Sequence, residues 1–116
     1  MLLETPKFLQ GVYRFEGRGL DKPVPFDPKV AYVVPPDKRV RPFYFRAGNS
    51  SPEMIYLVLM RNDKPMRYCP LGAKGALDVG FHVIEETTPG TVLEVRFAAP
   101  DGVKGWVVVD VGLVET

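Results

Sequence analysis

The chain has 116 residues, of which 46% are hydrophobic and 25% are charged, with a formal net charge of +1 at pH 7. This composition is typical of one soluble globular domain and excludes a disordered or fibrous chain. The single cysteine, Cys69, excludes an intrachain disulfide, and no stretch approaches the roughly 20 apolar residues of a membrane helix.

The first alternating segment predicts a short edge strand over 12–16, with Tyr13 and Phe15 on one face. Residues 1–10 before it are expected to form an N-terminal arm, and 11–116 a single β-sandwich domain. The arm lacks the apolar run of a secretory signal, so the cytoplasm is the expected location.

Prolines and glycines separate the middle of the chain into short segments. Three prolines over 21–28 exclude a helix and predict an ordered loop. Phe43 and Phe45 are expected in the core, with Tyr44 and Arg46 outside. The strand over 54–60 is apolar on both faces, as is typical of a central strand. Strands are predicted over 29–34, 40–46, 54–60 and 66–69.

The last third of the chain alternates strictly between apolar and other residues, which places one face of each strand in a core. Pro-Gly and Asp-Gly turns separate the three strands. The predicted core positions are Leu77, Val79, Phe81, Val83, Leu93, Val95, Phe97, Val107, Val109, Val111 and Leu113.

Seven or eight such strands without a helix predict an all-β fold, an antiparallel two-sheet sandwich, with a small OB-like barrel as the alternative. The unit from the Thr88-Pro89-Gly90 turn to the closing strand resembles the end of immunoglobulin-like, E-set-type domains. The resemblance implies a Greek key with the N-terminal strand beside the C-terminal one. The missing Cys pair excludes the antibody branch.

Charge is divided unevenly along the chain: residues 1–74 hold thirteen Lys/Arg against seven Asp/Glu, and 75–116 hold two against seven. Such asymmetry indicates either an anionic partner or two strand sets that attract each other. The basic and aromatic segment 38–46 makes single-stranded nucleic-acid binding one alternative function, because bases stack on aromatic rings while Lys and Arg contact phosphates.

A soft-metal site is a second alternative, since Met, Cys and His are the ligand types that copper uses. The candidates are Met66, Cys69 and His82, with Met54 and Met60 as further methionines. Methionines that fill a core and a cysteine that packs as a small hydrophobe explain the same residues. Alternation places His82 outside, and one histidine is too few for a blue-copper centre. We therefore expect no metal, no cofactor and no enzyme activity.

Apolar side chains at the even positions of the last strands are expected on the outer face of a sheet. Exposed apolar patches mark partner surfaces, and Trp is an enriched interface anchor. We therefore predict a non-enzymatic accessory or assembly module that binds a protein partner or a second copy. The predicted interface consists of Trp106, Val108, Val114, Val92 and Ile84. Alternatively, Met1, Leu2, Leu3 and Phe8 cover this face.

Overall fold

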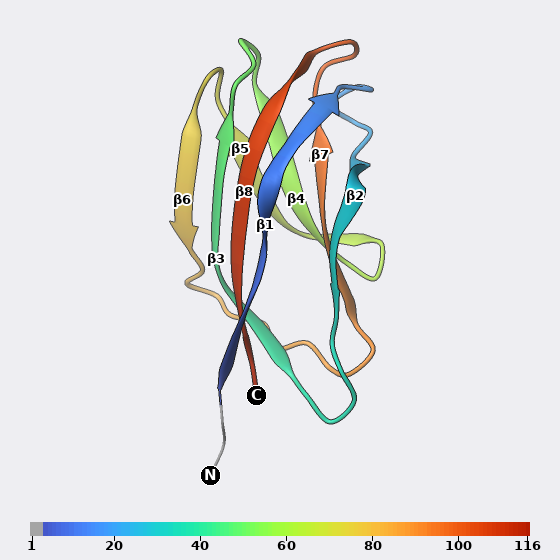
Figure 1. Ribbon diagram of the computed structural model, residues 1–116, viewed down its shortest axis with the longest axis vertical. Helices are drawn as coiled ribbons and strands as arrows, with labels where there is room; N and C mark the ends of the chain where they lie inside the picture. The colour runs from blue at the N-terminus through green and yellow to red at the C-terminus, as the bar shows by residue number, and fades with distance from the viewer. Residues whose placement is uncertain (1–3) are drawn as a thin grey trace.

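The computed structural model describes residues 4–116 and contains eight antiparallel strands in two four-stranded sheets. Sheet A has the order β1-β8-β3-β6 and sheet B the order β2-β7-β4-β5. Figure 1 shows sheet A in front, with β6, β3, β8 and β1 from left to right, and sheet B behind it. The strands are β1 (Thr5–Glu16), β2 (Val24–Val33), β3 (Val40–Asn49), β4 (Ile55–Arg61), β5 (Lys64–Leu71), β6 (Ala76–Gly80), β7 (Val92–Ala98) and β8 (Lys104–Glu115).

The predicted antiparallel sandwich is confirmed, and so is the pairing of the N-terminal with the C-terminal strand, because β1 and β8 pair along their whole length. Among the eight strands of residues 4–116, only β4 and β5 are joined as a hairpin within one sheet, and every other connection crosses between the sheets. Two four-stranded sheets connected in this way form a jelly roll, which consists of two Greek keys. The sheets stay open at their edges, so the OB-like barrel is not formed.

The core lies between the sheets and is built from the alternating residues of each strand. Val107, Val109, Val111 and Leu113 of β8 are buried, and so are the three predicted core residues of β7. Tilted contacts between the rings of Phe26, Phe97 and Phe15 close one end of the core. The two-residue period of the last third therefore predicted the buried face correctly in β7 and β8.

Strand boundaries differ from the sequence prediction at three places. β1 begins at Thr5, so 5–10 belong to sheet A and do not form an arm. β2 begins at Val24, inside the predicted loop, and its pairing with β7 is irregular between Pro25 and Val30. β6 ends at Gly80, so Val83 is 70% exposed in the connection to β7 and not in the core.

Phe43 is a further correction, because it lies outside the buried core cluster. The register of β3 against β8 shifts between Pro42 and Tyr44, which leaves Phe43 as the extra residue of a bulge. Its ring packs against the Arg41 guanidinium, whose carbon lies 5.5 Å from the ring centre. Phe45 follows the bulge and is buried as predicted.

Ion pairs within the molecule join the basic first part of the chain to the acidic remainder. Four of them join an arginine of the first 74 residues to a carboxylate of the remainder: Arg39–Glu86, Arg46–Asp110, Arg61–Glu85 and Arg67–Glu85. This favours attraction between the two halves as the explanation of the asymmetry. Residues 4–116 contain no helix long and apolar enough to cross a membrane.

Candidate functional site

The outward side chains of sheet A form a continuous surface, which we call the outer face of sheet A. The strand registers arrange it in rows that run across β1, β8, β3 and β6. Three complete rows are Val12–Val108–Gly48–Ala76, Gln10–Asp110–Arg46–Asp78 and Phe8–Gly112–Tyr44–Gly80, with Arg14 beside Trp106 at one end.

Large apolar groups are exposed on this face. Val12 is 60% exposed and Val108 is 53% exposed, and the two lie opposite each other on β1 and β8. Phe8 is also exposed, on the same face of β1. Exposed apolar patches of this kind are typical of interaction surfaces.

Trp106 is held in place at the end of the face. The Arg14 guanidinium stacks on its indole, 4.7 Å from the ring centre. Its backbone N–H donates to Ser50 Oγ at 2.7 Å, and its carbonyl accepts from the N–H of Ser50. The hydrogen bonds hold the backbone of Trp106 and the stacked guanidinium holds its indole, and a side chain ordered before binding loses less conformational entropy when a partner binds.

A charged cluster occupies the middle row. Arg46 on β3 reaches across to Asp110 on β8, with 2.5 Å between Nη2 and Oδ2. The Tyr44 hydroxyl donates to the other oxygen of Asp110 at 3.1 Å, and the Arg46 guanidinium lies over the Tyr44 ring. Burial and the hydrogen bond to Asp110 raise the pKa of Tyr44, so its hydroxyl remains a donor at neutral pH.

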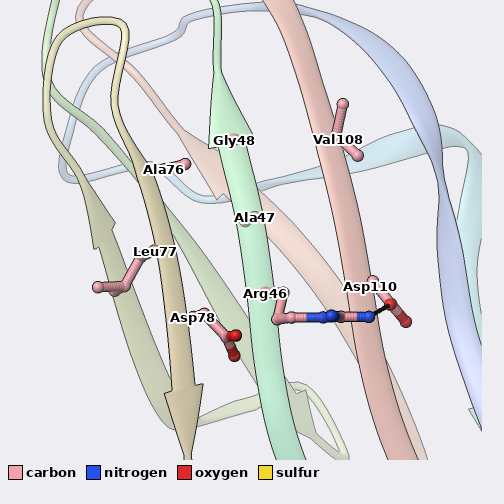
Figure 2. Close-up of a pocket in the computed structure, with 8 residues that line it drawn as sticks. All are labelled: Arg46, Ala47, Gly48, Ala76, Leu77, Asp78, Val108 and Asp110. Carbon is pink, nitrogen blue, oxygen red and sulfur yellow. Dashed lines mark hydrogen bonds and ion pairs between the residues drawn. The ribbon is translucent and has the colours of Figure 1, made fainter.

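A shallow hollow of about 520 Å³ lies beside this cluster. Figure 2 shows Arg46 extended towards Asp110, Asp78 on the other side of Arg46, and Gly48 with Ala76 next to Val108. The hollow exists because two adjacent strands carry small residues in the same row: a Cβ on Gly48 would lie 4.0 Å from that of Ala76. A large side chain of a partner therefore has room above β3 and β6.

The five residues predicted as an interface are divided between three places. Trp106, Val108 and Val114 lie on the outer face of sheet A, whereas Val92 belongs to sheet B and Ile84 to the β6–β7 connection. Met1, Leu2 and Leu3, predicted to cover this face, lie outside the described residues. Phe8 does not lie over Trp106 but is itself an exposed part of the face, opposite Gly112.

Several residues of the face were missed by the sequence analysis. Val12 has the opposite parity to Tyr13 and Phe15, and this was the signal that could have placed it outside. Gly48 and Ala76 carry no comparable signal. A small residue in a sequence is equally consistent with a turn and with a strand interior, and the hollow becomes evident only when its neighbours across the sheet are known.

The candidate soft-metal ligands are not assembled into a site. Cys69 is 3% exposed in the core, where burial raises the pKa of its thiol to about 11 and keeps it protonated. His82 lies exposed in the β6–β7 connection. Across residues 4–116, no three His, Cys, Asp or Glu side chains lie close enough together to hold a metal ion.

Each of the three arginines in the basic segment 38–46 has a carboxylate partner within the molecule. Arg39 pairs with Glu86 at 2.9 Å, Arg41 with Glu4 at 3.2 Å, and Arg46 with Asp110. The bulge also moves Phe43 out of the regular alternation. The structure therefore gives nucleic-acid binding by this segment no added support.

Comparison with known proteins gives a likeness of fold. No protein-family model matches the sequence, and no curated protein matches it. Among solved structures, the chain is similar to the CBM36-1 domain of a multidomain xylanase from the hindgut metagenome of Trinervitermes trinervoides. The TM-score is 0.58 and the identity 11%, and the match covers 95% of this chain and 96% of the other.

Proposed function

We propose that this chain is a non-catalytic accessory or assembly module that binds a protein partner through the outer face of sheet A. The observation that carries the proposal is the combination of exposed apolar side chains with a central charged cluster on one sheet face. Trp, Tyr and Arg are the residue types that contribute most to binding at protein interfaces. This face holds Trp106, Tyr44 and the arginines Arg14, Arg46 and Arg41, the last of which lies opposite Val114.

The rigidity of the face supports the same function. Its side chains come from four hydrogen-bonded strands and not from loops. Arg14 stacks on Trp106, and Arg46 and Tyr44 both hold Asp110. Side chains that are ordered before binding lose less entropy when the complex forms, so a modest contact area gives measurable affinity.

Photo-crosslinking tests this function. A benzoylphenylalanine at position 108 is expected to give crosslinked polypeptides in the cells that naturally produce the protein. The matched control carries the same group at Val33, which is 57% exposed on sheet B, against 53% for Val108. Products that form from position 108 and not from position 33 support the proposal, whereas no product, or equal products from both positions, contradicts it.

Carbohydrate binding is a second candidate for the same face, favoured by the structural likeness to a carbohydrate-binding module of a xylanase. The face offers what a sugar chain needs: aromatic rings at Trp106 and Tyr44, and hydrogen-bonding groups at Gln10 and Asp78. Soluble xylan in a native gel would then slow migration of the parent and not of Trp106→Ala. Unchanged migration of the parent contradicts xylan as the ligand.

A further inference from the structure

We infer that the protein partner is a second copy of this chain, packed with its outer face of sheet A against the same face of the first. The inference rests on the proposed function, because it names the occupant of that face. Face-to-face packing is a common way for two antiparallel sheets to bury apolar side chains. A twofold axis parallel to the strands places β1 over β6 and β8 over β3 of the second copy.

Charge complementarity selects this arrangement. In the middle row, Gln10–Asp110–Arg46–Asp78, the axis reverses the order of the second copy. Arg46 then faces Asp110 of the second copy, and Asp78 faces Gln10. Two arginines and two aspartates alternate around the axis, so each guanidinium has a carboxylate within its own copy and another opposite. An axis perpendicular to the strands and centred on this row would instead stack Arg46 on Arg46.

Side-chain size is complementary in the same arrangement. In the row Val12–Val108–Gly48–Ala76, each valine of one copy faces a small residue of the other. Val108 faces Gly48 and Val12 faces Ala76, so the valines enter the hollow above β3 and β6. Each copy thus carries both the valines that protrude and the small residues that receive the valines of the other copy.

In the row that contains Phe8, a large side chain of one copy again faces a small residue of the other. Phe8 on β1 faces Gly80 on β6 of the second copy, and a Cβ at Gly80 would meet nothing within 4 Å, so the space above it is open. At the two central positions of this row, Gly112 and Tyr44, no side chain protrudes from the face. The Tyr44 ring lies over Gly112 of its own chain, in the space that a side chain at 112 would occupy.

The contact area is sufficient for a weak, specific dimer. Four strands spaced about 4.8 Å apart, each with outward residues over about 20 Å, cover roughly 400 Å² in projection. Two copies would bury on the order of 1,000 Å² of accessible surface, the lower end of specific interfaces. We therefore expect a dimer that dissociates on dilution.

Sedimentation equilibrium of the full chain over a wide range of concentrations tests the inference. The parent is expected to shift from monomer to dimer as the concentration rises. Val108→Glu places a charge over Gly48 of the second copy and is expected to weaken the dimer by about 30-fold or more. Val33→Glu, a charge equally exposed on sheet B, is expected to leave the dimer unchanged.

A compensating pair of variants tests the geometry. Gly80→Phe fills the space that Phe8 of the second copy enters, and is expected to weaken the dimer without lowering the melting temperature, since a Cβ at this position meets nothing within 4 Å in the monomer. Combining it with Phe8→Ala exchanges the large and small positions and is expected to restore the dimer. Failure of this rescue overturns the twofold arrangement.

The outcomes separate this inference from the function on which it rests. A parent that stays monomeric at every concentration overturns the dimer, and so does a dimer that Val33→Glu dissociates and Val108→Glu does not. In either case, a different polypeptide crosslinked from position 108 would leave the proposed function standing. Absence of any crosslink together with a monomeric parent overturns both.

Discussion

Replacing Gly17 by alanine is expected to lower the free energy of unfolding by about 3 kcal/mol. Gly17 follows β1 and lies against the turn between β7 and β8, where an added Cβ would overlap the Pro100 carbonyl oxygen and lie 2.7 Å from that of Ala99. Both neighbours are backbone atoms, so no side chain can rotate away.

The turn cannot move without losing hydrogen bonds. The Gly17 N–H donates to the Val103 carbonyl at 2.7 Å, and the Gly17 carbonyl accepts from the Gly102 N–H at 3.0 Å. Urea unfolding measures the loss of stability. Gly72→Ala is the matched control, since a Cβ there meets nothing within 4 Å, and it is expected to change stability by less than about 0.5 kcal/mol. Equal effects of the two substitutions would refute the steric explanation.

Gly17 illustrates what sequence alone can establish here. A glycine after an alternating segment correctly marks the end of a strand, because that signal is local. The residues that exclude a side chain at this position, Ala99 and Pro100, lie more than eighty positions further along the chain. Local pattern predicts where strands end, but not which distant turn packs against the end.

The same limit explains why the core was predicted better than the binding face. Alternation assigns Val107 and Val109 to the inside and Val108 to the outside, as the structure shows. It does not say to which sheet a strand belongs. Val92 is therefore on an outer face, as its parity implies, but on the face of sheet B.

Errors within single strands have local causes. Phe43 left the predicted core because a bulge adds one residue to β3 and reverses the parity around it. Val83 was placed in the core because its parity continues that of Leu77 and Val79, yet pairing with β3 ends at Gly80. A strand without a neighbour to pair with does not continue, however regular its alternation.

Replacing Tyr32 by phenylalanine is expected to lower the free energy of unfolding by about 2 kcal/mol at pH 8, through the loss of one hydrogen bond to a charged group. Tyr32 on β2 donates its hydroxyl to Glu115 at the end of β8, so this bond joins sheet B to sheet A. Glu115 is buried, and without the tyrosine its carboxylate loses that partner.

The pH dependence of the stability difference between the parent and Tyr32→Phe tests whether the Tyr32–Glu115 hydrogen bond is its cause. Burial, followed by the hydrogen bond and the negative charge of Glu115, raises the pKa of Tyr32 above its value in the unfolded chain. The folded state therefore retains this proton at a pH where the unfolded state has lost it. The stabilising contribution is complete below pH about 10 and declines as the pH rises further. The difference between the parent and Tyr32→Phe should accordingly shrink between pH 8 and pH 11.

Two matched variants complete the experiment. Tyr68→Phe removes a hydroxyl from an exposed ring and is expected to leave stability within about 0.5 kcal/mol of the parent. Glu115→Gln keeps an acceptor for Tyr32 and removes the buried charge, so its loss of stability should be smaller than that of Tyr32→Phe. If Tyr32→Phe instead matches Tyr68→Phe in urea unfolding at pH 8, the hydrogen bond between Tyr32 and Glu115 contributes nothing to stability.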